Sequence, residues 1–341
     1  MPLAQMPLDC EVHVIADWFE FYVLKSQYEA ASFSDLQRMW DRRRNTEDSA
    51  PDGRRETSRA RDGDEQFLET VLTEVRERIK CLDAAYPFEF NKSGEGLRLK
   101  SDLEVGNVVY LFCLLLSSAN SSEIFELDKF SYKLDNKVRD LFQACSTWAA
   151  ASVTKGSAWS FGFPRPDGSN FLDKLRQIYE LFGEGRVRDS PLPGVSLSLK
   201  DGGIDIIAWA HRADFAAGRL YILGQVATGG NWPNKSVVEY LIPFHHDWFS
   251  DNPSSHPTPA LFIPYCIPVP EDATLQQRIH ILTRQYGNVY YRYVIPRLAN
   301  EGYELAKNDT NLSIDRIGDF DSIKAWVLGI LDRMKQAIAT A

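Results

Sequence analysis

The feature that most constrains the fold of this chain is the succession of helix and strand signals between residues 170 and 267. Apolar residues from 171 to 182 recur at helical spacing, Asn170 is suited to cap the start of that helix, and Gly183 is suited to end it. Short apolar segments then predict strands at 195–199, 206–209, 219–227 and 259–267, and 235–248 has a helical pattern. The predicted order is helix, three strands, helix, strand, with 206–209 and 219–227 pairing antiparallel.

The signals before residue 156 are mainly helical. Helices are predicted at 10–28, after a capping-box pattern at 34–37, and at 67–84, 105–118 and 136–152, with a hairpin joining 86–90 to 96–100. Residues 42–65 carry dense charge and almost no large apolar side chain, which predicts a mobile loop. Glycine and proline punctuate 156–168, which is typical of a linker.

These patterns predict an α+β (mixed α/β) fold with two domains. We expect a mainly helical domain over residues 1–155 and a second domain over 156–341, whose core is 170–267 and whose C-terminal helices occupy 271–341. The N-terminal order of helices followed by a hairpin also fits a winged helix, which would place the helix at 67–84 in a DNA groove. Because exposed positions on that helix alternate in charge sign, we favour a solvated structural helix.

Composition narrows the class of protein further. The 341 residues are 44% hydrophobic and 25% charged, as in globular proteins, and the longest apolar run, 108–116, is too short to span a bilayer. Without an export signal at the N-terminus, the cytoplasm is the expected location. Five scattered cysteines predict neither disulfides nor structural zinc. A net charge of −9 argues against a broad basic nucleic-acid surface, so any DNA binding must be local, metal-assisted or helped by a partner.

Two polar positions stand at the ends of neighbouring predicted strands. The turn Asp201-Gly-Gly-Ile-Asp205 opens one strand, and Gln225 lies late in the next. With the surrounding order of elements, this stretch resembles the Mrr-like branch of the PD-(D/E)xK restriction-endonuclease-like nucleases, over residues 170–267. In that family an Asp and a Glu or Gln on these two strands bind Mg²⁺ and activate water.

The resemblance implies a set of site residues. Asp205 and Gln225 would hold Mg²⁺ (or Mn²⁺), and Asp201 would add to the metal site from the same turn. A Glu from the first core helix often joins such sites, for which Glu184, or else Glu180, is the candidate. One carboxylate, an amide oxygen and a substrate phosphate suit a hard cation. Glycines at 202 and 203 would bend the backbone and leave space for a phosphate.

The chain departs from the family pattern at the catalytic lysine. Two residues after Gln225, where the family has Lys, this chain has Ala227, and the nearest lysine is Lys235. Lys235 would then reach back to serve as the catalytic cation. The resemblance therefore implies a Mg²⁺-dependent DNA endonuclease, in a bacterial defence role against foreign DNA. The alternative is an inactive nuclease-fold subunit that binds DNA or a partner protein. The sequence leaves the oligomeric state open.

Simpler structural roles compete with these functional ones. Gln225 would serve equally as a buried amide whose hydrogen bonds are satisfied by the backbone. The adjacent His245 and His246 point in different directions on a helix, which favours packed or solvated histidines over a metal site. Trp232, Trp248 and Phe249 are typical of a core edge.

Overall fold

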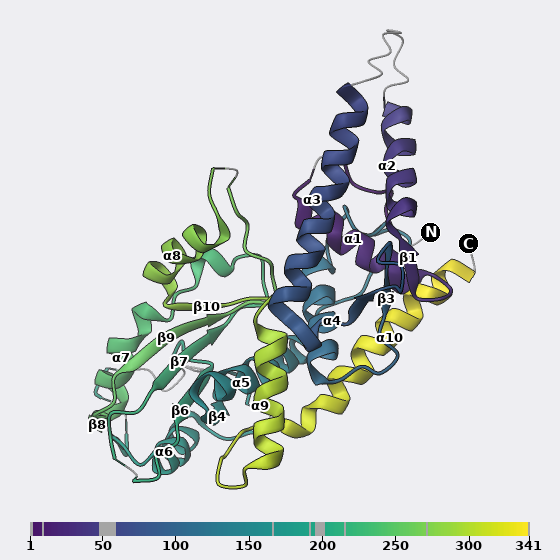
Figure 1. Ribbon diagram of the computed structural model, residues 1–341. Coiled ribbons are helices and arrows are strands. Elements are labelled where there is room, and N and C mark those ends of the chain that lie inside the picture. Colours follow the sequence, from purple (N-terminus) through teal and green to yellow (C-terminus); the bar gives the residue numbers. More distant parts are fainter. Residues whose placement is uncertain are drawn as a thin grey trace. The chain divides into compact units, whose positions relative to one another are not determined.

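The computed structural model describes residues 3–8, 10–47, 59–165, 167–190, 192–194, 202–214, 216–270 and 272–339 (Figure 1). The chain forms two compact units: unit 1 comprises Met1–Leu134 with Ile323–Ala341, and unit 2 comprises Asp135–Ser322. In the described ranges, ten helices and ten strands confirm the expected α+β fold. No helix within these ranges is both long and apolar enough to cross a membrane.

Unit 1 combines helices with a small antiparallel sheet. Its elements are α1 (Val12–Lys25), β1 (Ala30–Ser32), α2 (Phe33–Glu47), α3 (Arg59–Leu82), a 3₁₀ turn (Asp83–Ala85), β2 (Phe88–Phe90), β3 (Gly96–Leu99), α4 (Val105–Ser118) and nearly all of α10 (Phe320–Ala339). The predicted hairpin is confirmed as β2 and β3, and β1, which was not predicted, pairs with the other side of β3.

The mobile loop predicted at 42–65 is wrong at both of its ends. Helix α2 continues to Glu47 and α3 already begins at Arg59, so only residues 48–58 remain, and they lie outside the described residues. The capping contact of α2 is also displaced from 34–37. Ser32 and Asp35 bond reciprocally: the Ser32 amide donates to Asp35 Oδ2 at 3.1 Å, and the Asp35 amide donates to Ser32 Oγ at 3.0 Å.

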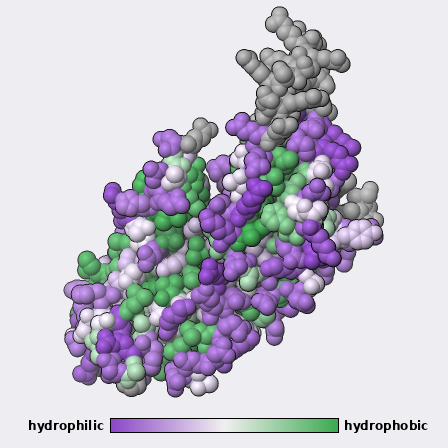
Figure 2. All heavy atoms as spheres, in the orientation of Figure 1, coloured by the Kyte–Doolittle hydropathy of each residue, from purple (hydrophilic) through white to green (hydrophobic). Residues whose placement is uncertain are grey.

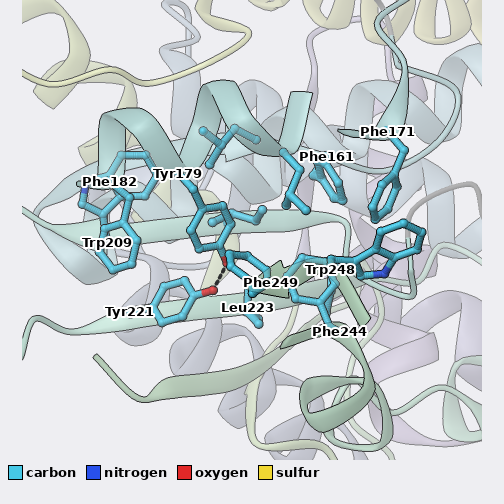
Figure 3. Close-up of a cluster of buried hydrophobic side chains, with 14 of the residues drawn as sticks. Phe161, Phe171, Tyr179, Phe182, Trp209, Tyr221, Leu223, Phe244, Trp248 and Phe249 are labelled. Atoms are coloured by element: carbon cyan, nitrogen blue, oxygen red, sulfur yellow. Dashed lines mark hydrogen bonds between the residues drawn. The ribbon is translucent and has the colours of Figure 1, made fainter. Parts of the chain in front are cut away.

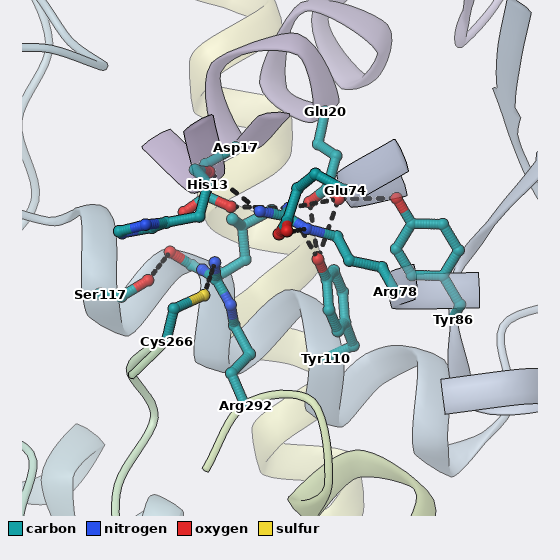
Figure 4. Close-up of polar contacts among 11 residues, drawn as sticks. His13, Asp17, Glu20, Glu74, Arg78, Tyr86, Tyr110, Ser117, Cys266 and Arg292 are labelled. Carbon is teal, nitrogen blue, oxygen red and sulfur yellow. Dashed lines mark hydrogen bonds and ion pairs between the residues drawn. The ribbon is translucent and has the colours of Figure 1, made fainter. Parts of the chain in front are cut away.

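Helix α3 is held to unit 1 by a buried ion cluster around Arg78 (Figure 4). The Arg78 side chain is fully buried, and its Nη1 lies 2.7 Å from both Asp17 and Glu20 on α1. The Tyr86 hydroxyl donates to Glu20 at 2.7 Å, and burial together with the Glu20 charge raises the pKa of Tyr86 well above its ordinary value. The charge of Arg78 is therefore neutralised inside the core and is not presented to DNA.

Unit 2 is built on a five-stranded mixed sheet. Its elements are α5 (Asn136–Thr154), β4 (Gly156–Ser160), α6 (Phe171–Phe182), β5 (Arg186–Val187), β6 (Ile206–Ala210), β7 (Tyr221–Val226), α7 (Val238–Trp248), β8 (Phe249–Asp251), β9 (Pro257–Phe262), α8 (Leu275–Tyr286), β10 (Asn288–Tyr290) and α9 (Ile295–Asn308), with 3₁₀ turns at Trp232–Asn234 and Ile317–Asp319. The strand order is β10-β9-β7-β6-β4. β4, β6 and β7 run antiparallel, and β9 and β10 lie parallel to β7.

The linker predicted at 156–168 is wrong, because its first five residues form the edge strand β4. Gly156 pairs with Ala210 of β6, and a Cβ on this glycine would lie 2.0 Å from the Trp209 carbonyl oxygen. Gly156 therefore allows β4 to lie close to β6, and it does not act as a flexible linker residue. The strand predicted at 195–199 lies outside the described residues.

An aromatic cluster joins α6 and α7 to one face of this sheet (Figure 3). Tyr179 and Phe182 of α6 pack against Tyr221 and Leu223 of β7, and the two tyrosine hydroxyls are hydrogen-bonded to each other. The predicted caps of α6 are confirmed at Asn170 and Gly183. Side-chain alternation sends every second residue of β6 and β7 to this face, and the α5 helix, which supplies no member of the cluster, packs against the same strands from the opposite face.

The boundary between the units differs from the one predicted at residues 155 and 156. Helix α5, expected in the N-terminal domain, belongs to unit 2 because it packs along β4, β6, β7 and α9. Gly302 of α9 permits this contact, since a Cβ there would lie 1.9 Å from the Trp148 carbonyl oxygen. Of the predicted C-terminal helices, α8 and α9 lie in unit 2, whereas α10 is grouped with unit 1 from Ile323 onward.

Candidate functional site

Unit 2 contains a cleft of about 830 Å³ beside the start of β6 and the end of β7. Its walls come from α5, the turn before β6, the segment after β7, and α7. Three of the residues singled out from the sequence, Asp205, Gln225 and Lys235, line this cleft. Residues separated by as many as 30 positions in the sequence thus meet at one sheet edge.

Asp205 and Gln225 lie at neighbouring strand ends. The β6–β7 ladder ends at the pair of Ile206 with Gly224, so Asp205 immediately precedes β6 and Gln225 follows Gly224 in β7. A Cβ on Gly162 would lie 2.5 Å from Asp205 Oδ1 and 2.6 Å from Gln143 Oε1, so the Asp205 carboxylate lies near Gln143 of α5. Both Asp205 and Gln225 line the cleft.

The backbone of Asp205 is fixed on both sides. Its amide donates to the Gly224 carbonyl oxygen at 2.8 Å, and its own carbonyl oxygen accepts from the Phe161 amide at 2.7 Å. The side chain is also anchored, because its Oδ2 accepts from the Val226 amide at 2.8 Å. A half-buried carboxylate held in this way is preorganised for binding.

Gln225 is buried, with 8% of the residue exposed, yet its Oε1 has no hydrogen-bond partner among the residues that the structure describes. The alternative that its carbonyl oxygen is satisfied by the backbone is therefore wrong. An unpartnered buried oxygen costs on the order of 1–3 kcal/mol, and most such oxygens in proteins are paired. An unpaired oxygen at the wall of the cleft is suited to accept a hydrogen bond from a ligand or to bind a cation.

Lys235 follows the 3₁₀ turn Trp232–Asn234 and lines the cleft together with Asn234. Its amide donates to the Trp232 carbonyl oxygen at 3.0 Å. Ala227, where the resemblance led us to expect a lysine, is 1% exposed, and its amide donates to the Phe262 carbonyl oxygen at 3.0 Å. The Ala227 backbone thus takes part in the hydrogen bonding of the sheet. The lysine that lines the cleft is Lys235.

The predicted role of Glu184 at the metal site is wrong. Its carboxylate accepts from Arg219 Nε at 3.0 Å and from the Ser255 amide at 2.8 Å, and the residue does not line the cleft. The buried guanidinium of Arg219, 35 residues away in the sequence, forms an ion pair with the Glu184 carboxylate. Glu180 on α6 is exposed and also lies outside the cleft. Asp201 lies outside the described residues.

Helix α5 contributes cleft residues that the sequence analysis did not identify. Gln143 Nε2 donates to the Asp205 carbonyl oxygen at 3.0 Å and to Ser160 Oγ at 2.6 Å. One turn earlier, Arg139 Nη1 donates to Thr228 Oγ1 at 3.1 Å. The available signal was a polar stripe at helical spacing: Asn136, Arg139, Asp140 and Gln143.

The glycines of the turn before β6 have a different use from the one expected. Gly202 and Gly203 have φ of +63° and +81°, which confirms the predicted sharp bend. The space beside them is filled by aromatic rings and not left for a phosphate. A Cβ on Gly203 would lie 2.4–2.7 Å from ring atoms of Tyr240 on α7.

The two histidines of α7 are packed and solvated, as expected. His245 is 9% exposed, and its Nδ1 lies 3.0 Å from the Leu241 carbonyl oxygen, whereas the His246 side chain is 72% exposed. The predicted core-edge positions of Trp232, Trp248 and Phe249 are confirmed by exposures of 7% or less. In the described ranges, no group of three or more His, Cys, Asp or Glu side chains is arranged to hold a metal.

Burial of His245 predicts a loss of stability in mild acid. Desolvation lowers its pKa below the ordinary value, so below about pH 6.5 the unfolded chain takes up a proton that the folded chain does not. The free energy of unfolding should fall by up to about 1.4 kcal/mol per pH unit between pH 6.5 and the folded pKa. Melting curves of His245→Gln should show a smaller loss than the wild type between pH 7.5 and 5.5. His246→Gln is the matched control, and equal losses in all three proteins would contradict the prediction.

Searches of protein-family models, curated proteins and solved structures found no match to this chain.

Proposed function

We propose that unit 2 is a Mg²⁺- or Mn²⁺-dependent phosphodiesterase that cleaves DNA. The observation that carries this proposal is that Asp205 and Gln225, whose Oε1 has no hydrogen-bond partner among the described residues, line one cleft at the start of β6 and the end of β7. Mg²⁺ is commonly held by one or two carboxylates, with waters and substrate phosphates completing its shell. An anchored carboxylate and a neutral oxygen without a partner fit such a cation.

The chemistry divides among the cleft residues. A divalent cation bound there would polarise the phosphate and lower the pKa of an attacking water. Asp205 supplies the negative charge that such a site requires, and Gln225 supplies a neutral oxygen beside it. Lys235 brings a positive charge to the same cleft, where it would stabilise the charge that develops on the phosphate. Gln143 acts on Asp205 through its backbone and is a positioning residue.

The topology of unit 2 also supports the proposal. When α6 and β5, which lie between β4 and β6, and β8, which lies between α7 and β9, are set aside, the remaining order α5-β4-β6-β7-α7-β9 is a helix, three antiparallel strands, a helix and a parallel strand. This is the order on which the resemblance to PD-(D/E)xK nucleases rests, although its first helix and strand are α5 and β4 and not the elements predicted at 170–199. The polar stripe of α5 then takes the place expected for Glu184.

A second candidate is an inactive nuclease-fold subunit that binds DNA or a partner protein. The buried Ala227 at the position of the family's lysine favours it. A place in bacterial defence and a partner subunit rest on the resemblance alone. The two candidates differ in one property, which is metal-dependent strand cleavage.

Cutting of circular single-stranded DNA and nicking of supercoiled plasmid in Mg²⁺ or Mn²⁺ test the proposal through Lys235. We expect Lys235→Ala to lower the nicking rate by about 100-fold or more, as for loss of other groups that stabilise transition-state charge. Lys307→Ala, which removes an exposed lysine of α9, is the matched control and should cut at the wild-type rate. A wild-type protein that cuts no plasmid or oligonucleotide in either metal would support the inactive subunit.

A further inference from the structure

Two exposed aromatic residues line the cleft. Phe163 is 52% exposed and Tyr240 is 41% exposed, and both line the cleft that contains Asp205. The other two aromatic residues of its wall, Phe244 and Trp248, are buried at 1% and 2%. Single exposed apolar residues are ordinary, but two rings that open onto one polar cleft are suited to stacking on a flat ligand.

Tyr240 is held next to the proposed metal site by the glycine turn. The three nearest atoms to a Cβ built on Gly203 are Cγ, Cδ1 and Cδ2 of Tyr240, so the ring rests on this glycine. Gly203 precedes Asp205 by two residues, a span of at most about 7 Å. A base stacked on Tyr240 would therefore place its phosphate within one nucleotide of Asp205.

The charge of the cleft does not suit a duplex. Its cationic side chains are Arg139 and Lys235, against three carboxylates, Asp140, Asp205 and Asp247. Affinity for duplex DNA depends on the neutralisation of many phosphates, and the chain as a whole carries −9. Stacking on aromatic rings needs no excess of positive charge and contributes strongly for each base.

The volume of the cleft also favours a single strand over a duplex. At about 830 Å³ it falls in the range of roughly 300–1,000 Å³ that is usual for small-molecule sites. Such a volume accepts one or a few nucleotides whose bases are splayed out. An intact double helix cannot bring its stacked bases to rings that line the cleft.

Resting on the nuclease function proposed above, we infer that the substrate is a single-stranded nucleic acid or an unpaired end, whose bases stack on Phe163 and Tyr240 while its backbone passes Asp205. Arg139 and Lys235 provide the phosphate contacts, and the two rings provide most of the affinity. The DNA substrate would then be cut where it is unpaired. RNA bases would stack on these rings in the same way, so the experiment compares single-stranded DNA with single-stranded RNA.

Fluorescence anisotropy tests the inference, with Ca²⁺ in place of Mg²⁺ to prevent cutting and with short labelled single-stranded DNA, single-stranded RNA and duplex DNA. We expect single strands to bind at least about 10-fold more tightly than duplex, and Phe163→Ala and Tyr240→Ala each to weaken single-strand binding by about 10-fold. Tyr240→Phe should retain affinity, and Tyr28→Ala, which removes a ring that is 84% exposed in unit 1, should change nothing. Two phosphate contacts predict a salt slope of about −1.4.

Several outcomes separate this inference from the nuclease function. Duplex binding as tight as single-strand binding, or unchanged affinity in both alanine variants whose melting curves match the wild type, would overturn the inference. Tight single-strand binding that depends on both rings, without cutting in Mg²⁺ or Mn²⁺, would uphold the inference while removing the nuclease function. Cutting of duplex DNA at the wild-type rate by both alanine variants would overturn the inference and uphold the nuclease function.

Discussion

Replacing Asp205 with asparagine is expected to lower metal-dependent nicking by more than about 100-fold, because losing even an outer-shell partner of a metal site commonly costs 10–100-fold. The substitution removes one of the three carboxylate charges of the cleft. It keeps an oxygen that can still accept from the Val226 amide, which now donates to Asp205 Oδ2 at 2.8 Å. The fold should therefore survive, and the loss should appear in the rate of cutting on plasmid gels.

The matched control for this experiment is Asp214→Asn. Asp214 is exposed on the turn between β6 and β7, where it pairs with Arg212 at 2.7 Å. We expect this variant to cut at the wild-type rate. An Asp205→Asn protein that melts like the wild type and cuts as fast would remove Asp205 from the catalytic machinery.

The largest stability effect is expected in unit 1, at Arg78. Its buried guanidinium lies 2.7 Å from Asp17 and Glu20 and 2.9 Å from Glu74. Arg78→Met would leave the fully buried Glu20 carboxylate without its cation, and breaking a buried pair in this way typically costs about 3–5 kcal/mol. Urea unfolding of the full chain, followed by circular dichroism, should show the transition of unit 1 at a lower urea concentration.

Two further variants identify the cause of that loss. Adding Glu20→Gln to Arg78→Met should restore part of the stability, because it removes the uncompensated charge and keeps an acceptor for the Tyr86 hydroxyl. Arg76→Met removes an exposed arginine from the same helix and should change the free energy of unfolding by no more than about 0.5 kcal/mol. Equal effects of Arg78→Met and Arg76→Met would contradict the account of the buried cluster.

Elements defined by local signals were predicted closely from the sequence. Helix α4 has the predicted bounds, Val105–Ser118, and α6 has its predicted caps, because spacing and capping act within a few residues. Strands β4 and β10 were missed, since β4 depends on how closely Gly156 can approach a strand more than 50 residues away. The grouping of α5 with unit 2 likewise depends on packing against β6, β7 and α9.

Tertiary packing also limited which residues of the site could be predicted from the sequence. Asp205 and Gln225 were predicted through the resemblance, and the antiparallel pairing of β6 and β7 brings the two residues to one cleft. Glu184 was misassigned because its partner, Arg219, is decided by tertiary structure. Arg139 and Gln143 were overlooked because their helix was assigned to the other domain, which hid the polar stripe that faces the cleft.

Mn²⁺ binding measured on the protein alone tests the central claim most directly, which is that Asp205 and Gln225 hold a divalent cation. Electron paramagnetic resonance of free Mn²⁺ gives the number of ions bound. We predict one saturable ion per chain, lost in Asp205→Asn and weakened in Gln225→Leu. Without metal, Gln225→Leu should melt no lower than the wild type, because it removes an oxygen that has no partner. Absence of saturable Mn²⁺ binding, or equal binding by all three proteins, would contradict the proposed site.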